Sequence, residues 1–170
     1  MVPVRASDPA SPFRDWYVWS QIEPSDRFEG MVFPGVENEK WTYGEVAQAW
    51  YRHRFYRFEP DLNTDNPVVR EEIQKIAMFW LGLGVSGFRV DAAPFLIEPK
   101  SRPGCGPDFS FLRDLREALS WKRGDSVMLA EANVSDQELT DYFGQSDGIA
   151  AAPPSWNCPP APDVSTAPST

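Results

Sequence analysis

Two segments of the chain, residues 66–82 and 108–121, carry apolar side chains at the spacing of an α-helix. Residues three or four apart lie on one face of a helix, so each segment is predicted to bury one stripe. Asn66 can cap the start of the first helix, and Pro67 suits its first turn. The predicted buried stripes are Val69, Ile73, Ile76, Ala77 and Trp80 in the first helix, and Phe111, Leu112, Leu115 and Leu119 in the second.

Each of these helices is followed by a short apolar run that predicts a buried strand, at residues 86–91 and 126–131. A third helix is predicted over 136–143, where Ser135 and Glu138 have the spacing of a capping box. The residues 93–107 hold four prolines and two glycines and are predicted to form a loop. Helices that alternate with parallel strands indicate an α/β fold.

The rest of the chain lacks a clean helical or strand period. Short strands are expected around Trp16–Trp19 and Tyr51–Phe58, within a segment rich in aromatic residues. The expected organisation is a disordered start at 1–10, an irregular inserted subdomain at 11–60, an α/β part at 61–147 and a disordered tail, rich in Pro, Ala and Ser, at 148–170.

Composition and charge exclude several classes of partner. The 170 residues, 42% of them hydrophobic, are enough for one modest core. The formal net charge of -9 argues against a nucleic-acid partner, whose backbone would repel the chain. No apolar stretch is long enough to span a membrane, and the start lacks the pattern of a signal peptide. Cys105 and Cys158 are expected to be free thiols, so a cytoplasmic protein is predicted.

Charged residues stand at the ends of both predicted strands. Arg89 and Asp91 are two residues apart and therefore share a face, where the arginine would keep the carboxylate ionised and oriented. Glu131 ends the second apolar run. Two carboxylates at the ends of neighbouring strands suit glycosidic bond cleavage, with one as nucleophile and the other as acid and then base. The alternatives are a structural Arg–Asp pair and a solvated glutamate at a strand end.

Several runs of the sequence carry a family resemblance. "SPFRDWYVWS", "HRFYRFEPDLNTDNPVV", "FWLGLGVSGFRVDAAPFLIE" and "LAEAN" resemble glycoside hydrolase family 13, the α-amylase family, and most of all its trehalose synthase and α-glucosidase branch. The resemblance covers roughly Ser11 to Gly144. It implies that Asp91 is the nucleophile, that Glu131 is the general acid and that Arg89 contacts the substrate.

The resemblance also implies a fold. A whole (β/α)8 barrel typically needs ~250 residues, more than this chain has. The chain is therefore expected to be an internal fragment, a partial (β/α)8 (TIM) barrel with the fourth and fifth strand regions and an irregular inserted subdomain. The family's Asn-His pair and its later Asn-His-Asp run occur nowhere in the sequence. The third carboxylate of the family is thus missing, and little activity is expected from the chain alone. A shifted reading frame or a genuine flexible tail could each account for residues 148–170.

By the same resemblance, the chain acts on a small α-glucoside such as maltose or trehalose and uses no organic cofactor. Isomerisation of maltose to trehalose is the favoured reaction. Hydrolysis by an α-glucosidase or α-amylase type of enzyme is one alternative, and a non-catalytic binding or scaffold protein is another. A small independent α/β domain with an unrelated role is a third. The aromatic residues of 11–60 would form either a sugar-binding platform or the core of that subdomain.

A calcium ion is also implied by the resemblance. Its ligands would be the carboxylates of Asp61 and Glu98 and the main-chain carbonyls of Phe95 and Leu96, since oxygen ligands suit Ca²⁺. The asparagine ligand of the family is missing here, so the site is expected to be incomplete and weak. The alternatives are a turn residue for Asp61 and a surface carboxylate for Glu98.

Overall fold

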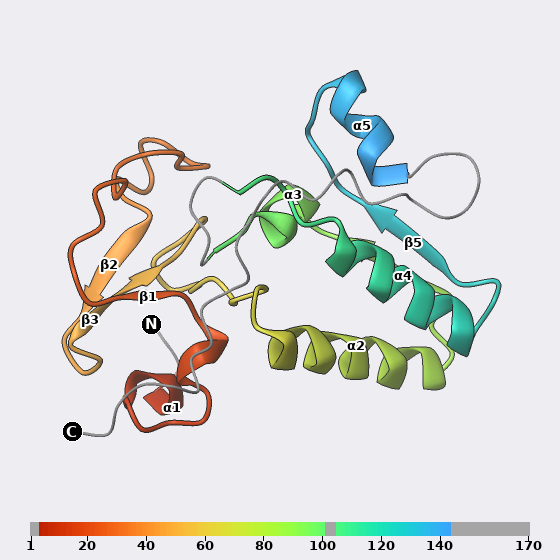
Figure 1. Cartoon of the computed structure of the whole chain (residues 1–170), viewed down its shortest axis with the longest axis horizontal. Helices are drawn as coiled ribbons and strands as arrows, with labels where there is room; N and C mark the ends of the chain where they lie inside the picture. The colour runs from red at the N-terminus through yellow and green to blue at the C-terminus, as the bar shows by residue number, and fades with distance from the viewer. Residues whose placement is uncertain (1–3, 101–104, 144–170) are drawn as a thin grey trace. The chain divides into compact units, whose positions relative to one another are not determined.

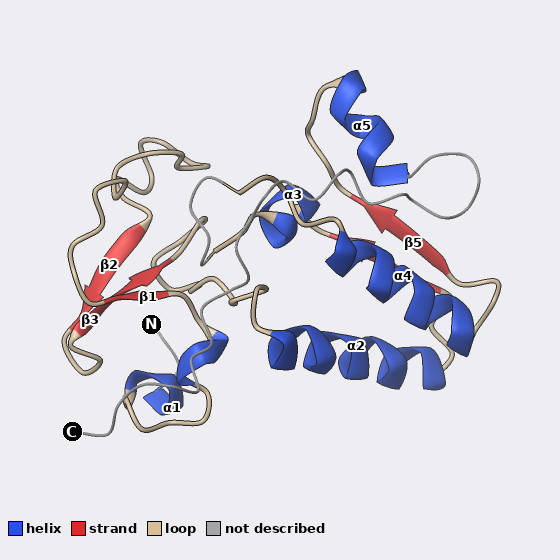
Figure 2. Cartoon of the chain, in the orientation of Figure 1, coloured by secondary structure: helices blue, strands red, loops and turns tan. Residues whose placement is uncertain are grey.

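The computed structural model describes residues 4–100 and 105–143, and the chain divides into two compact units between Ile73 and Gln74. The tail predicted at 148–170 lies outside the described residues. The first unit holds α1 (Val4–Ser7), η1 (Arg14–Trp16), β1 (Trp19–Ser20), β2 (Trp41–Gly44), β3 (Ala49–Arg52) and the start of α2 (Pro67–Gly82) (Figure 1). The second holds the rest of α2, β4 (Gly87–Val90), α3 (Ala93–Ile97), α4 (Ser110–Lys122), β5 (Val127–Ala130) and α5 (Asp136–Phe143) (Figure 2).

The first unit is built on a small antiparallel sheet with the strand order β1-β3-β2. Trp19 pairs with Tyr51, and Thr42 pairs with Tyr51 from the other side. Strand β1 overlaps the strand expected at Trp16–Trp19 only at Trp19, because Trp16 ends the 3-10 helix η1. Strand β3 begins before the expected Tyr51–Phe58 and ends at Arg52, and β2 was not predicted. The chain turns after Arg52, where the Glu59 amide donates to the Tyr56 carbonyl at 2.8 Å, so the aromatic run from Phe55 onward is not a strand.

The second unit contains the parallel pair β4–β5, which confirms the α/β class. One face of this pair packs on helices. Leu115 and Leu119 of α4 are buried with Ala77 and Leu81 of α2, against Phe88 and Met128 of the strands. A second cluster joins Val90, Ala93, Ile97 and Leu112. The predicted apolar face of α4 is confirmed at all four positions, Phe111, Leu112, Leu115 and Leu119.

Helix α2 spans the predicted range, and its cap is confirmed because the Asn66 side-chain oxygen accepts the Val68 amide at 2.9 Å. Its predicted stripe is wrong in part. Ile76 and Trp80 are 52% and 48% exposed, whereas Leu81 is buried. The buried face is therefore turned by one residue, because packing against α4 selects Ala77 and Leu81, which are also four residues apart.

The predicted loop at 93–107 is wrong at its beginning, where the five-residue helix α3 forms. Pro94 lies in the first turn of this helix, where a missing amide hydrogen costs nothing. Burial of Ala93 and Ile97 then holds the helix against the strands. Helix α5 has the predicted bounds, and its capping box is confirmed by hydrogen bonds between Ser135 and Glu138.

Cys105 is disulfide-bonded, which corrects the expectation of a free thiol at this position, and its partner lies outside the described residues. The expectation rested on separation along the chain, which does not limit distance in the fold. Within the part of the chain that the structure describes, no helix has both the length and the apolar character that crossing a bilayer requires.

Candidate active site

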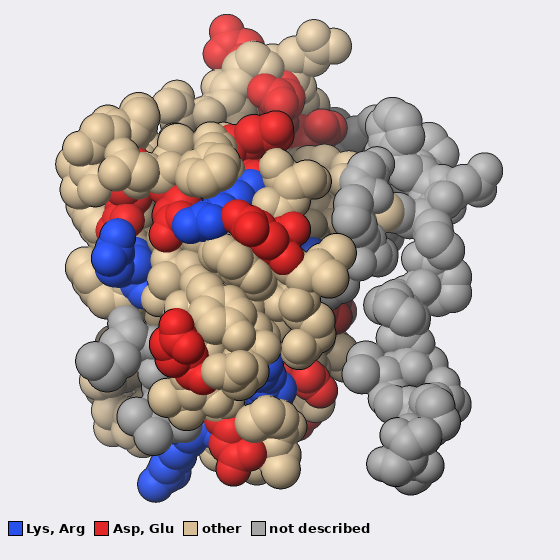
Figure 3. Space-filling view, turned by 90° about the vertical axis from the view of Figure 1, so that its left-hand side faces the viewer, with Lys and Arg blue, Asp and Glu red and all other residues tan. Residues whose placement is uncertain are grey.

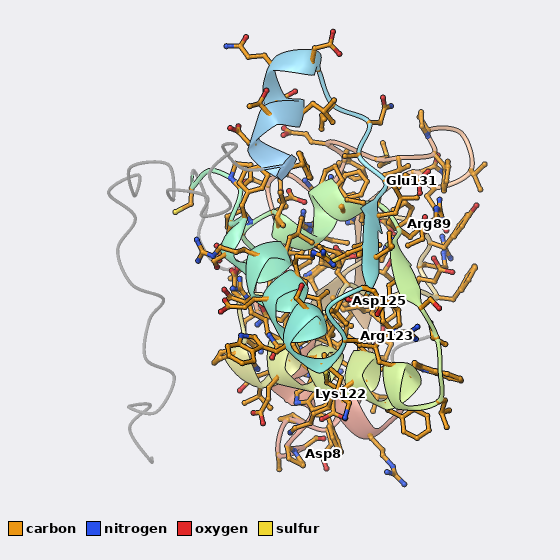
Figure 4. All side chains as sticks on the ribbon, turned by 90° about the vertical axis from the view of Figure 1, so that its right-hand side faces the viewer. Asp8, Arg89, Lys122, Arg123, Asp125 and Glu131 are labelled. Carbon is orange, nitrogen blue, oxygen red and sulfur yellow. The ribbon has the colours of Figure 1, made fainter. Side chains whose placement is uncertain are left out.

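The parallel pairing of β4 and β5 brings their carboxyl ends to one edge. Val90 pairs with Ala130, so the next residues, Asp91 and Glu131, follow a matched pair. The Glu131 amide donates to the Val90 carbonyl at 2.9 Å and continues the ladder by one step. Figure 4 shows Arg89 and Glu131 together near one end of the strands, with Asp125 towards the other. The sequence expectation that both carboxylates stand at neighbouring strand ends agrees with this register.

Arg89 joins the two carboxylates. Its Nη2 atom lies 2.9 Å from Asp91 Oδ1 and also donates to Glu131 Oε2. The three side chains are exposed, at 58% for Arg89, 72% for Asp91 and 52% for Glu131. A shared guanidinium nitrogen orients both acids while leaving them open to a ligand. The geometry can therefore present two carboxylates to the same bond.

Gly87 allows the two strands to approach closely. A Cβ atom built on Gly87 would lie 2.3 Å from the Val127 carbonyl oxygen, closer than any real Cβ contact. Only a residue without a side chain fits there. Gly87 thus contributes to the site indirectly, because it lets β4 pair with β5 in the register that aligns Asp91 with Glu131.

No pattern in the sequence singled out Ala92, the residue after Asp91. Ala92 has φ 48° and ψ 42°, the left-handed conformation, and is the N-cap of α3. Alanine rarely adopts this conformation, so the sequence carries no signal for it. The neighbouring Pro94 was the available sign that a helix starts directly after the strand.

The four residues expected to bind calcium fall into both units, with Asp61 in the first and Phe95, Leu96 and Glu98 in the second. The Asp61 carboxylate accepts the Arg54 amide at 2.9 Å and lies 3.6 Å from Arg52 Nε. In the second unit, the Lys100 ammonium donates to the Phe95 carbonyl and lies 3.8 Å from Glu98 Oε2.

Cationic side chains of the protein thus already engage three of these oxygen donors. A dication would have to displace the Lys100 ammonium, whose side chain is only 3% exposed, so this arrangement does not fit calcium. The described residues also hold no cluster of three or more His, Cys, Asp or Glu side chains that could bind a metal ion.

The aromatic residues of the first unit divide between two settings. Trp41 and Tyr51 are buried, in agreement with the interpretation as a small core. Phe33, Tyr56 and Phe58 instead form a partly exposed stack, with ring centroids 5.3 Å and 5.2 Å apart. His53 is fully buried and hydrogen-bonds Thr42 Oγ1 at 2.9 Å, away from any nucleophile pairing.

Comparisons with known proteins show which family the chain resembles. Residues 4–152 match the family described as "Alpha amylase, catalytic domain". Over 162 residues the chain is 40% identical to a trehalose synthase of Thermus thermophilus, covering 94% of this chain and 16% of that enzyme. Over 171 residues it is 31% identical to maltase A2 of Drosophila melanogaster, covering 79% of this chain and 30% of the maltase.

A solved structure is similar as well. The crystal structure of the α-amylase from H. orenii has a TM-score of 0.66 and 28% identity, over 82% of this chain and 27% of that one. The chain thus spans less than a third of the length of each of these relatives. The match to the catalytic domain extends over most of the chain, and the chain belongs to the α-amylase family, glycoside hydrolase family 13.

Proposed function

We propose that this chain carries the nucleophile and the general acid of a retaining enzyme acting on small α-glucosides. The observation that carries the proposal is the bridge from one Arg89 nitrogen to both Asp91 and Glu131. Two oxygens that share one donor are at most about 6 Å apart. That spacing is compatible with the retaining pair, which has about 5–5.5 Å between carboxyl groups.

In this mechanism Asp91 attacks the anomeric carbon while Glu131 donates its proton to the leaving oxygen. A covalent glycosyl ester on Asp91 results, and the leaving sugar departs as an alcohol. Glu131 then takes a proton from the incoming hydroxyl, which attacks the same carbon and restores the Asp91 carboxylate. Because Arg89 donates to Glu131 in the free protein, the substrate must draw Arg89 away from Glu131 before that residue acts as an acid.

We further propose isomerisation of maltose to trehalose as the overall reaction, supported by the 40% identity to a trehalose synthase. Hydrolysis is the alternative, favoured by the likeness to a maltase. In the first case the hydroxyl in the second step belongs to glucose, and in the second case it belongs to water. Strands β4 and β5 are then the fourth and fifth strands of a (β/α)8 barrel, with the first unit as the inserted subdomain.

No step of this mechanism uses calcium, and three of its four expected oxygen donors lie against Lys100 or Arg52. A cytoplasmic location remains an expectation from the sequence. The disulfide at Cys105 weakens this expectation, which rested in part on free thiols, since disulfides persist in oxidising compartments.

The test is covalent trapping with 5-fluoro-α-glucosyl fluoride, read by intact mass and peptide mapping. Asp91 should form a bond to the anomeric carbon as fluoride leaves with its electron pair. Asp91→Asn should lose the label, while Asp114→Asn, a half-exposed carboxylate on α4, should label like the unmodified chain. Glu131→Gln should still label within about tenfold, because fluoride needs little protonation, yet lose about 10²–10⁴-fold in turnover of maltose.

Two results would overturn the proposal. Labelling should be slow, because the third carboxylate of the family is missing from the sequence. One such result is therefore the absence of any label on a folded chain even after prolonged incubation, which would favour a binding or scaffold role. The other is a label on a residue other than Asp91. Incubation with maltose then separates the two reactions, since an isomerase accumulates trehalose and a hydrolase accumulates glucose.

A further inference from the structure

Ala92 interrupts the ladder between β4 and β5 at the point where the two carboxylates emerge. The Glu131 amide donates to the Val90 carbonyl at 2.9 Å, and the Glu131 carbonyl accepts the Ala93 amide at 3.0 Å. In a regular parallel ladder a residue bonds to partners two positions apart on the next strand, so the second donor would be Ala92. The observed donor is one residue later. One extra residue therefore lies across Asp91–Ala92, where β4 ends and α3 begins, and this one-residue excursion, which resembles a β-bulge, is called the bulge below.

The bulge depends on an unfavourable backbone conformation. Among the described residues other than glycine, only Gln48 and Ala92 have positive φ. A side chain with a Cβ atom is disfavoured there, so the surrounding contacts must hold Ala92 in place. Ala93, fully buried beside Val90 and Leu112, fixes one side. The Ala92 carbonyl accepts the Phe95 amide at 3.0 Å and fixes the other.

The bulge also determines the direction of the Asp91 side chain, because Asp91 is the other residue inside it. Bulges change the direction of side chains next to active sites. Here the Asp91 side chain lies 2.9 Å from the guanidinium that also holds Glu131. The main-chain groups of Glu131 are bonded to Val90 and Ala93, the residues on either side of the Asp91–Ala92 pair, and these bonds couple the backbone positions of the two acids.

We propose that Ala92 is a positioning residue, whose left-handed conformation aims Asp91 at the bond that Glu131 protonates. This inference rests on the function proposed above. In this proposal Ala92 does not contact the substrate. Its effect passes through the hydrogen bond from Ala93 to Glu131 and the direction of the Asp91 side chain.

The test compares Ala92→Gly with Ala92→Val. Glycine keeps the left-handed conformation without a Cβ penalty, whereas β-branched valine resists it. Trapping with the fluoride should proceed within about threefold of the parent for the glycine variant. For the valine variant, the maximal trapping rate should fall by about 10²-fold, the cost of a small misplacement of a reacting group. The half-saturating concentration of fluoride should stay nearly unchanged.

Gln48→Val is the matched control, because Gln48 has φ 47° but belongs to the first unit. It should show similar backbone strain without slowing the trapping. A trapping rate close to that of the parent is expected for Ala92→Gly. Together with the melting temperatures of the three variants, it separates an effect on positioning from a loss of stability. Equal trapping rates for the folded Ala92→Val variant and the parent would overturn the inference.

A second readout does not depend on catalysis. The scalar coupling across the hydrogen bond, between the Ala93 amide nitrogen and the Glu131 carbonyl carbon, reports the bulge directly by NMR. It should be present in the parent and in Ala92→Gly and absent in Ala92→Val. If no variant is trapped, the proposed function fails, and this coupling still decides the role of Ala92. A coupling that persists in the valine variant overturns it.

Discussion

The two units of the chain use charge in opposite ways. In the first unit four charged side chains are buried, Glu37, Lys40, Arg52 and Arg54. In the second, Arg89, Asp91 and Glu131 are all more than half exposed. A buried charge must be paired because desolvation is costly, whereas an exposed charge contributes little to folding. Lys100, whose side chain is 3% exposed, is an exception in the second unit. The comparison indicates that charge supports the fold in the first unit, whereas the charges at the ends of β4 and β5 are available for chemistry.

Charges on the surface also differ in how they are paired. On the face drawn in Figure 3, basic side chains lie beside acidic ones, while the acidic side chains near the top have no basic side chain among them. Arg27, for example, contacts both Glu23 and Glu39. Such neighbouring opposite charges largely cancel, in contrast to the excess of carboxylate over guanidinium around Arg89.

The largest expected effect on stability comes from removing a buried charge. Arg52→Met leaves the nearly buried Asp61 carboxylate without its guanidinium neighbour, and should cost about 3 kcal/mol of unfolding free energy. The matched change in the second unit, Arg89→Met, should cost less than about 1 kcal/mol. Hydrogen exchange of the β3 and β4 amides measures each unit separately. Equal losses in the two variants would contradict the comparison.

A steric change in the second unit should have a somewhat smaller effect. Gly87→Ala places a Cβ atom 2.3 Å from the Val127 carbonyl oxygen, which is backbone and cannot swing aside. The strands must separate, at a cost of about 2 kcal/mol. Faster exchange should be confined to β4 and β5.

The control is Gly82→Ala, since no atom lies within 4 Å of a Cβ at that helix end. It should leave the exchange rates unchanged or slow them slightly, because alanine favours a helix. Unchanged strand exchange in Gly87→Ala would contradict the close approach of β4 and β5.

Sequence reasoning captured local features and missed those that depend on partners. Helix α4 and the capping box of Ser135 and Glu138 follow from spacing within one segment, and both are present. The face of α2 was misjudged because Ile76 and Leu81 are equally apolar and only packing chooses between them. Strand β2 depends on pairing with β3, and the bulge at Ala92 depends on hydrogen bonds to a strand some 40 residues later.

In the candidate site, too, only the features that depend on a single segment could be predicted. The ends of two apolar runs predicted that Asp91 and Glu131 stand at the ends of neighbouring strands, and the register of β4 and β5 agrees. That Arg89 reaches Glu131 as well as Asp91 could not be inferred, because it requires the register between β4 and β5. Likewise, the engagement of Phe95 and Glu98 by Lys100 results from the way the chain turns after α3.

His53 provides a pH test of the buried network. Burial lowers the pKa of His53 below its usual value of 6.5, opposed by the nearby Glu37, Asp61 and Glu39 and assisted by Arg57. The unfolded chain therefore binds a proton at a pH where the folded chain does not. Stability should be complete above about pH 6.5 and fall as the pH drops to the folded pKa, with a slope of at most about 1.4 kcal/mol per pH unit.

The measurement is urea denaturation of the first unit, followed through β3 amides between pH 7 and pH 5. His53→Gln removes the titrating group while keeping a hydrogen-bonding side chain near Thr42, so it should flatten this slope. A slope of the same size in the glutamine variant would assign the pH dependence to another group.

The smallest expected effect tests an exposed charge in the second unit that has a structural role. Hydrogen bonds from the Ser135 hydroxyl and amide lower the pKa of Glu138 at the start of α5. The carboxylate stabilises the helix above its usual pKa of 4.5, and this contribution is lost as the pH falls through the lowered folded value. Amide exchange along α5 should therefore quicken below about pH 4.5 while α4 stays protected. Ser135→Ala should remove that dependence, because the carboxylate then loses the hydroxyl that favours its charged form. If α4 lost protection together with α5, the exposed carboxylates of this unit would support its core as well, and the division of roles between the two units would fail.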